Sequence, residues 1–353
     1  MLGLSHLAQA SEDLIHAHPQ TRCLVCGSIG KIRYRNLTDK VFGALGRWNL
    51  SRCSHPRCGM LWLDPMPLAA DIRKAYREYY THDDVGAAPK PASGAGRVVD
   101  AMLQSVKRAY VATHLGYSDR QLTMRDRMLG VLALLDPTRR AETDFPLKYL
   151  PWEKRGRLLD VGCGSGELLV RMRSLGWRVE GVDFDPAAVA VARRKGLSVR
   201  EGSLREQNFP DACFDAVVMS HVIEHVHEPR ELLIEVRRIL KPSGRLVIAT
   251  PNASSLGHRI LRDAWPFLDP PRHLQIFTPR ALEAIVRAAG FDDVRVCTEI
   301  RSAAAMLPLL RTHWLWKTLR IKRIASRLFQ YGENLALHFD ADAGEEIALV
   351  AVR

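Results

Sequence analysis

The stretch RLLDVGCGSGELL, residues 157–169, places a glycine-rich turn between two apolar runs. A buried strand, a glycine turn and a helix in this order favour a ligand site where the strand ends. A dinucleotide-binding G-x-G-x-x-G turn would need glycine at the position of Glu167, and the carboxylate of Asp160 would repel a pyrophosphate. The turn therefore fits a cationic ligand better, such as an amino-acid moiety with an ammonium group and a sulfonium centre.

Strand and helix patterns alternate from this turn to the end of the chain. The predicted strands are residues 157–162, 177–184, 197–203, 214–220, 244–251, 292–300 and 345–353. The predicted helices are residues 166–176, 185–196, 228–244 and 278–291. This alternation predicts an α/β fold, a doubly wound, Rossmann-like parallel sheet of seven strands with ligand sites at the carboxyl ends of its strands.

Further candidate ligand contacts follow the next strands of the predicted sheet. Asp183 ends the second strand, 17 residues after the last glycine, where an acid can accept both ribose hydroxyls of an adenosine. Phe184 is expected to pack on the base, and Ser203 and Leu204 are expected near the adenine edge. Ser220 ends the fourth strand, on the side where a second substrate would lie.

Five ordered motifs extend this pattern over about residues 150–300 and the last strand. They read LDVGCGSGELL, VEGVDFDP, SHVIEHV, RILKPSGRLVIATPN and DPPRHLQIFTPRALEAIVRAAGF. This set resembles the class I S-adenosylmethionine-dependent methyltransferases, in their type 11/12 small-molecule group. The resemblance implies S-adenosylmethionine (SAM) as cofactor, although Ser203 stands where many relatives have an aspartate. The cofactor-binding residues that it implies are Asp160, Gly162, Cys163, Gly164, Gly166, Asp183, Phe184, Ser203, Leu204 and Ser220.

Three histidines are the candidate catalytic residues. His221 and His225 lie four residues apart in SHVIEHVHEP, and we expect them to share a helix face at the strand's carboxyl end. Histidine suits base catalysis near neutral pH, but residues at this place equally often shape the site without reacting. His273 lies in the proline-rich loop WPFLDPPRHLQIF, and we expect it to contact the substrate; the alternative is a purely structural loop.

Four cysteines near the N-terminus form two closely spaced pairs. Gly27 follows the pair Cys23 and Cys26, and Gly59 follows the pair Cys53 and Cys58. Two turns that each present two thiolates provide the four soft ligands of a structural Zn²⁺ site, in a zinc-ribbon-like segment. Unrelated thiols would have to produce both paired spacings by chance, and His55 is a weaker ligand candidate because four thiolates already complete the site. A redox role for the Cys-x-x-Cys is disfavoured, because nothing around the first pair reads as a βαβ unit.

The chain of 353 residues is long for one domain. We expect a zinc-binding segment at 1–84, a linker and helical region at 85–150, and a methyltransferase domain at 151–353. A basic helical insert is predicted at 302–335, and residues 310–330 could contact a membrane surface peripherally, although a solvated helix face is the simpler interpretation. The start has no basic region followed by an apolar one, so a cytoplasmic location is expected.

The leading functional prediction is a SAM-dependent methyltransferase acting on a small molecule, such as a sugar-linked or lipid-linked intermediate. The net charge of +12 and the cysteine segment leave a nucleic-acid-binding or -modifying zinc protein as an alternative. The sequence lacks the Asn/Asp-Pro-Pro-aromatic signature of base-methylating enzymes and shows no aromatic and basic groove, so a nucleic-acid partner is not expected. An NAD(P)-dependent oxidoreductase is a further alternative, which the glycine spacing disfavours.

Overall fold

The structure is a computed structural model. It describes residues 14–40, 42–76, 95–118, 122–133, 155–300, 332–333 and 335–353, together with 144, 147, 149–151 and 153. Nearly all of the predicted basic insert, including residues 310–330, and most of the predicted linker lie outside these residues. By its contacts the chain divides into two compact units. The first comprises Met1–Tyr80, His221–Ile234 and Ile248–Leu349, and the second Thr81–Ser220, Glu235–Val247 and Val350–Arg353.

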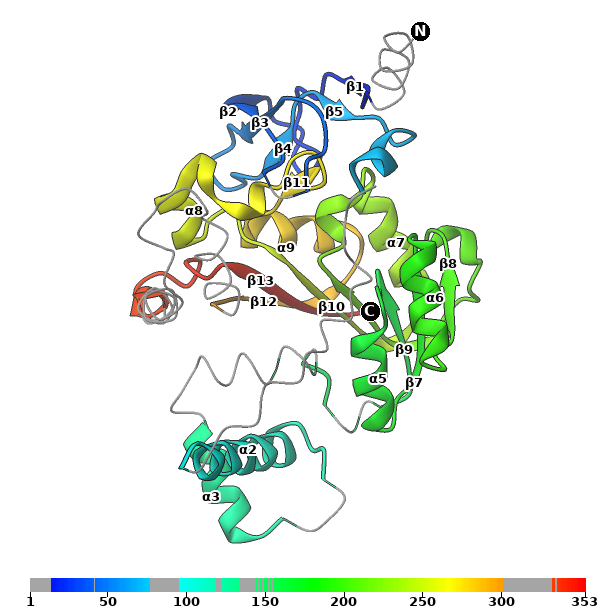
Figure 1. Cartoon of the computed structure of the whole chain (residues 1–353), viewed down its shortest axis with the longest axis vertical. Coiled ribbons are helices and arrows are strands. Elements are labelled where there is room, and N and C mark those ends of the chain that lie inside the picture. The colour runs from blue at the N-terminus through cyan, green and yellow to red at the C-terminus, as the bar shows by residue number, and fades with distance from the viewer. Residues whose placement is uncertain are drawn as a thin grey trace, which may run out of the picture. The chain divides into compact units, whose positions relative to one another are not determined.

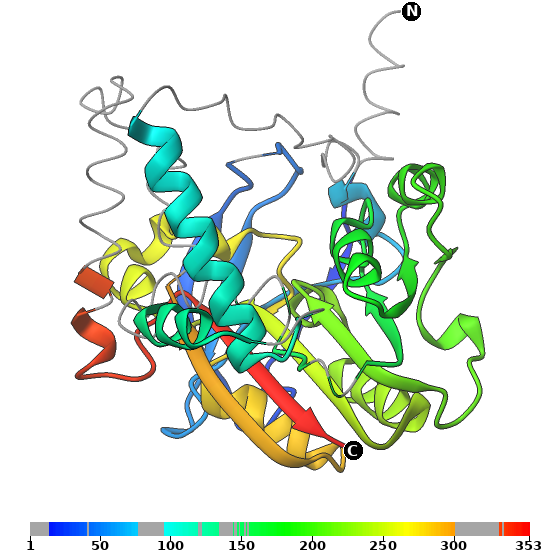
Figure 2. The same cartoon turned by 90° about the horizontal axis from the view of Figure 1, so that it is seen from below.

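A seven-stranded sheet confirms the fold predicted from the alternating patterns. Its order is β12-β13-β10-β9-β6-β7-β8. The strands are β6 (Arg157–Val161), β7 (Arg178–Asp183), β8 (Val199–Glu201), β9 (Phe214–Ser220), β10 (Leu240–Pro251), β12 (Asp292–Glu299) and β13 (Glu346–Val352). β6 pairs in parallel with β7 and β9, and β7 pairs in parallel with β8. Figures 1 and 2 show β12 and β13 side by side.

Helices in the second unit begin and end where short-range chemistry predicts. α5 (Glu167–Ser174) and α6 (Pro186–Arg194) lie beside β7 and β8 (Figure 1). Asp185 caps α6, because its side chain accepts a hydrogen bond of 2.9 Å from the backbone N–H of Ala187. Pro186 occupies the first turn, and Gly196 follows the helix with φ of 71°.

The helical region before the sheet contains α2 (Ala95–His114) and α3 (Met124–Ala133), which contact each other. Tyr117, just after α2, connects this region to the sheet core. Its hydroxyl donates to the carbonyl oxygen of Leu150 (2.8 Å) and accepts from the indole N–H of Trp177 (2.9 Å). The surrounding apolar core joins the strands to α5 and α6; it includes Leu158, Leu169, Met172, Val189 and Val218.

The first unit contains a small antiparallel sheet in the order β11-β4-β3-β2. Its strands are β2 (Gly30–Leu37), β3 (Trp48–Cys53), β4 (Leu61–Leu63) and β11 (Gln275–Ile276). β1 (Ala17–His18) pairs with β5 (Met66–Pro67). Figure 1 shows β11 beside the N-terminal strands, although more than two hundred residues separate them along the chain. β2 and β3 thus connect the two cysteine pairs, and β11 adds a fourth strand that the sequence did not indicate.

The remaining helices of the first unit are short. They include α8 (Leu256–Leu261), α9 (Pro279–Ala288) and 3-10 turns at Ile72–Tyr76, Ile223–His225, Arg262–Ala264 and Pro266–Leu268. α7 (Pro229–Ile239) begins in the first unit, and another 3-10 turn, Arg205–Gln207, lies in the second. The helix predicted to continue to residue 244 ends earlier, because β10 begins at Leu240. None of the described helices has the length and apolar character needed to cross a membrane.

Candidate active site

The glycine turn follows β6 and takes a backbone conformation that side chains disfavour. Gly162, Gly164 and Gly166 have φ of 71°, 51° and 81°, all in the left-handed region. A Cβ atom at Gly164 would meet nothing within 4 Å, so the backbone there faces open space. A Cβ atom at Gly166 would lie 2.3 Å from a methyl carbon of Leu197. The turn therefore needs glycine for its conformation, and Gly166 needs it for packing as well.

Two buried carboxylates lie on the neighbouring strands beside this turn. Asp160 on β6 is 3% exposed, and Asp183 at the end of β7 is 7% exposed. One carboxylate oxygen of Asp183 accepts from the backbone N–H of Gly164 at 2.7 Å, and the other accepts from that of Asp185 at 2.9 Å. Burial raises the pKa of Asp183, and these two N–H groups oppose that shift. Asp183 thus holds the turn and retains lone pairs for a ligand.

The other predicted cofactor contacts belong to the same unit. Ser220 ends β9, Leu204 is buried, and Ser203 is exposed beside the 3-10 turn that follows β8. Phe184, directly after Asp183, is 45% exposed, which leaves part of its ring accessible to a ligand. Cys163 is buried, and burial, together with the charges of nearby carboxylates, raises the pKa of its thiol. The thiol therefore stays neutral and packs as a small apolar group.

His221 and His225 do not share a helix face, so that prediction is wrong. Only Ile223–His225 form a 3-10 turn, and His221 precedes it with φ of 55°, a conformation incompatible with a continuous helix. His221 instead lies between two buried carboxylates. Its Nδ1 is 3.2 Å from Glu224 Oε1, and its Nε2 is 2.9 Å from Glu346 Oε1.

The two carboxylates determine the charge of His221. Burial alone would lower its pKa, but hydrogen bonding and attraction to Glu224 and Glu346 outweigh burial and raise the pKa to about 10. His221 is therefore a cation at neutral pH, with both ring nitrogens engaged. A group in this state cannot accept a proton, which disfavours the predicted role as general base; that role stays an untested prediction.

His225 and His273 form a second, neighbouring group with Glu224. Their rings lie 4.8 Å apart in an edge-to-face arrangement. His225 Nδ1 is 2.9 Å from the hydroxyl of Tyr76 and 3.0 Å from the carbonyl oxygen of Arg272. Burial, and then the charge of His273, lower the pKa of His225 to about 4, so it is neutral at pH 7. His273 is buried and its Nδ1 lies 2.7 Å from the carbonyl oxygen of Phe267. Its substrate contact also stays a prediction.

Glu224, His225 and His273 also offer ligand atoms within 4.8 Å of one another, a set that could in principle hold a metal ion. Glu224 already accepts a hydrogen bond of 2.9 Å from Thr250 and pairs with His221. The pKa of Glu224 lies at about 2, because attraction to the histidines outweighs the effect of burial. We therefore interpret this group as an internal ion-pair network.

Glu346 is the site residue that the sequence analysis missed. A signal for it is present, because the last strand begins with two acids, EEIALVAVR, in an otherwise apolar run. Both acids are buried: Glu345 accepts from the indole N–H of Trp265 at 2.8 Å, and Glu346 pairs with His221. A charged residue inside a buried strand end needs a partner, and that requirement could have pointed to a histidine or an arginine.

The four N-terminal cysteines lie together in the first unit. All four sulfur atoms are within 4.8 Å of one another. Cys23 and Cys58 are 3.7 Å apart, and Cys26 and Cys53 are 3.3 Å apart. Four thiolates around a tetrahedral Zn²⁺ would be separated by about 3.8 Å, given Zn–S bonds of about 2.3 Å. The spacing of the cluster therefore fits the predicted ion.

Known proteins are similar to the part of the chain that carries the glycine turn and Asp183. A methyltransferase domain family matches residues 136–296. Demethylmenaquinone methyltransferase of Thermus thermophilus is 33% identical over 181 residues, which cover 44% of this chain and 80% of that protein. A ubiquinone biosynthesis O-methyltransferase of Cereibacter sphaeroides is 34% identical over 150 residues, 39% of this chain and 61% of that protein.

Among solved structures, a SAM-dependent methyltransferase from Archaeoglobus fulgidus aligns with a TM-score of 0.43 and 24% identity, over 61% of this chain and 92% of that chain. The methyltransferase family model matches the region that contains the glycine turn and the acid at the end of β7, and this chain covers most of the Thermus relative. The seven-stranded sheet is consistent with both matches. The chain belongs to the class I SAM-dependent methyltransferases.

Proposed function

We propose that SAM binds at the carboxyl ends of β6 and β7, beside the glycine turn and Asp183. The buried carboxylate of Asp183 carries this proposal, because it orders the turn through Gly164 and keeps acceptor capacity for ribose hydroxyls. Asp160 adds a second negative charge that suits a cationic ligand. The open space at Gly164 lets a ligand approach the backbone. Bound SAM supplies a methyl group on a sulfonium centre, and the protein's task is chiefly to position it.

We propose a hydroxyl-bearing small molecule, carried on a lipid or a sugar, as the methyl acceptor. The relatives are named as a demethylmenaquinone methyltransferase and a ubiquinone biosynthesis O-methyltransferase, which makes a phenolic quinone precursor the first acceptor to test. Neither His221 nor His225 titrates near pH 7, since His221 is a cation and His225 is a weak base. The role that we propose for His221 is therefore electrostatic: a fixed positive charge beyond the end of β9 that favours an anionic acceptor oxygen.

The acceptor proposal is tested with SAM that carries a labelled methyl group. The purified chain is incubated with a catechol-type quinone precursor, a sugar nucleotide or transfer RNA, and each product is separated and counted. We expect label in a small-molecule fraction and none in RNA. An Asp183→Asn chain, which should bind SAM poorly, serves as the negative control. Transfer of label to RNA alone would overturn the small-molecule assignment and favour the nucleic-acid alternative.

We propose further that Cys23, Cys26, Cys53 and Cys58 hold a structural Zn²⁺ ion. Support comes from the sulfur separations and from the identity of the donors, since four thiolates complete a tetrahedral shell and leave no position for water. Hydrogen bonding from Cys58 lowers the pKa of Cys23 to about 5, which favours a thiolate in the cluster. The ion would connect the turn at Cys23–Cys26 with the end of β3 and the turn before β4.

Metal analysis of purified protein tests the zinc proposal. We expect one Zn²⁺ per chain in the wild type and a large loss in Cys53→Ser, because three thiolates hold the ion less tightly. Cys297→Ser is the matched control, since this thiol lies on β12, outside the cluster, and its variant should keep the full zinc content. Equal zinc in Cys53→Ser and in the wild type would rule out the four-thiolate site.

A further inference from the structure

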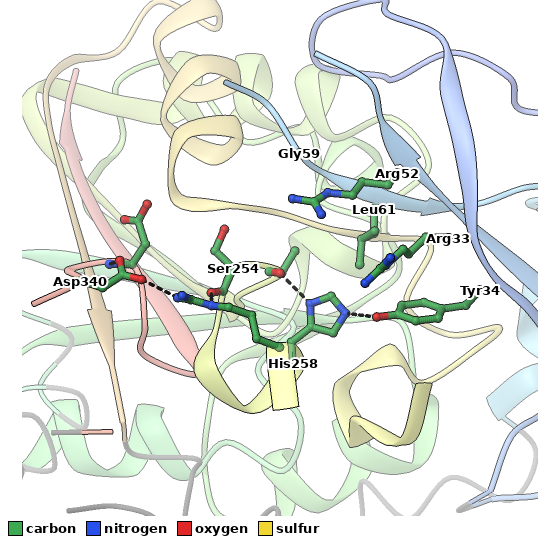
Figure 3. A pocket seen from close by; sticks show the side chains of 11 residues that line it. Arg33, Tyr34, Arg52, Gly59, Leu61, Ser254, His258 and Asp340 are labelled. Carbon is green, nitrogen blue, oxygen red and sulfur yellow. Dashed lines mark hydrogen bonds and ion pairs between the residues drawn. The ribbon is translucent and has the colours of Figure 1, made fainter. Parts of the chain in front are cut away.

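A pocket of about 350 Å³ lies within the first unit, and none of the residues that line it is assigned above to SAM or to the acceptor. Figure 3 shows Arg33 and Arg52 pointing into it from the small sheet, His258 and Tyr34 in contact along one wall, and Asp340 on the other side. Arg259 on α8 also lines it. The volume falls in the range of sites for small ligands.

A β-bulge aims the arginine of β2 into this pocket. Ile32 pairs with Ser51 and Tyr34 pairs with Leu50, so Arg33 is an extra residue on its strand. A bulge interrupts the alternation of side chains, which allows the consecutive residues Arg33 and Tyr34 both to line the pocket. The guanidinium of Arg33 lies over the ring of Tyr34, 5.4 Å from its centroid, which stiffens the side chain.

The second arginine is placed by the cysteine segment. Arg52 precedes Cys53, and Gly59 follows Cys58 with φ of 63°. A Cβ atom at Gly59 would lie 3.5 Å from a terminal nitrogen of Arg52, so the backbone of the cysteine turn borders the guanidinium. The residues that flank the second cysteine pair, Arg52 and Gly59, therefore line the pocket.

Positive charge in the pocket exceeds what its acids neutralise. Arg259 is bonded to Asp340 at 2.6 Å and to the carbonyl oxygen of Ser254 at 2.9 Å, and Asp342 is the second acid of the lining. Arg33 and Arg52 have no ion-pair partner within the part of the chain that the structure describes. Two guanidinium groups thus remain available to a ligand, and both are exposed.

His258 reports the same excess of positive charge. Its Nδ1 lies 2.6 Å from the carbonyl oxygen of Ala253, and its Nε2 lies 2.9 Å from the hydroxyl of Tyr34. A neutral ring satisfies both contacts, with Nδ1–H as donor and Nε2 as acceptor. Burial lowers the pKa of His258, and the charges of Arg33, Arg52 and Arg259 lower it further. The ring therefore adds no charge of its own.

We propose that this pocket binds the phosphate group of a small soluble phosphate ester. Two free guanidinium forks match the oxygens of a dianionic phosphate, and bidentate arginine contacts are the strongest charge-assisted hydrogen bonds. The ring of Tyr34 and the side chain of Leu61 provide an apolar surface for the ester's organic part. The site extends beyond the methyl-transfer reaction and does not depend on which acceptor is methylated.

Calorimetric titration of the full chain with phenyl phosphate tests the proposal. We expect saturable binding to the wild type, at least about tenfold weaker in Arg33→Gln and in Arg52→Gln, because each change removes a charge-assisted contact. Arg35→Gln is the matched control: it removes an exposed arginine of the same strand that does not line the pocket, and binding should stay within about twofold. Circular dichroism and thermal unfolding confirm that the variants fold.

Three results would overturn the proposal. Equal weakening in Arg35→Gln would show attraction to general surface charge, and benzoate binding as tightly as phenyl phosphate would assign the pocket to carboxylates. Sedimentation with phosphatidic acid vesicles that depends on Arg33 and Arg52, without binding of phenyl phosphate, would assign it to a lipid surface. SAM binding by the same variants is measured in parallel and should match the wild type, because neither arginine belongs to the proposed SAM site.

Discussion

The carboxylate of Asp183 supports both the glycine turn and the proposed ribose contact. Asp183→Asn replaces one acceptor oxygen with an amide NH₂ that faces a backbone N–H, so the turn loses a bond and the ligand loses a charge. We expect the affinity for SAM to fall at least about tenfold, measured by calorimetry. Asp185→Asn removes the same charge two residues away and keeps a good helix cap, so its affinity should stay near that of the wild type.

The positive charge of His221 contributes stability that the protein loses at alkaline pH. Its folded-state pKa is raised from about 6.5 to about 10, so its contribution is complete below pH 6.5 and is lost as the pH rises through 10. Urea unfolding at several pH values should show stability falling across this window in the wild type. His221→Gln should lack that decline. A decline of the same size in the variant would mean that other groups cause it.

At the scale of an element, the start of α5 depends on a glycine with two constraints. Gly166→Ala forces a side chain into the left-handed region, which costs about 1–2 kcal/mol, and pushes a methylene-sized atom against Leu197. Gly164→Ala shares the backbone penalty but has open space around it. In urea unfolding, Gly166→Ala should therefore lose more stability than Gly164→Ala. Equal losses would show that Leu197 moves aside without cost.

The elements that could be predicted from the sequence are those set by local patterns. Apolar runs located the strands of the large sheet, and Asp185, Pro186 and Gly196 marked both ends of α6. The prediction of one helix that carries His221 and His225 was wrong, because sequence spacing alone does not reveal the positive φ of His221. β11 was missed because it is only two residues long and pairs with β4, which lies far away in the chain. A run of two residues shows no alternation that would indicate a strand.

Across the first unit, one buried ion pair connects residues from distant parts of the chain. Arg272 is fully buried; it bonds to Asp39 at 2.7 Å, to Asp269 and to the carbonyl oxygen of Ala75 at 3.1 Å. Arg272→Leu leaves the buried Asp39 without its counter-charge and should destabilise the protein by about 3–5 kcal/mol in urea unfolding. Arg295→Leu, which breaks an exposed pair with Asp293, should cost less than about 1 kcal/mol.

Contacts between residues far apart in the chain also determine which parts of the sites could be predicted from the sequence. Cys23, Cys26, Cys53 and Cys58 could be grouped because each pair is local and thiolate chemistry supplies the long-range step. The two acids that open the last strand indicate that a partner is needed, but nothing local shows that Glu346 pairs with His221 or that Arg272 pairs with Asp39. The phosphate pocket escaped notice for the same reason: Arg33 and Asp340 are brought together only by the folded backbone.

The strand β11 also has a consequence for the order of events during synthesis. The ribosome makes β2, β3 and β4 early, but the edge of β4 stays open until residues 275 and 276 have emerged. An unpaired edge of buried residues such as Leu61 and Leu63 is a template for wrong partners. The N-terminal sheet is therefore complete only after residues 275 and 276 have been made. The downstream polypeptide acts on it as an intramolecular chaperone.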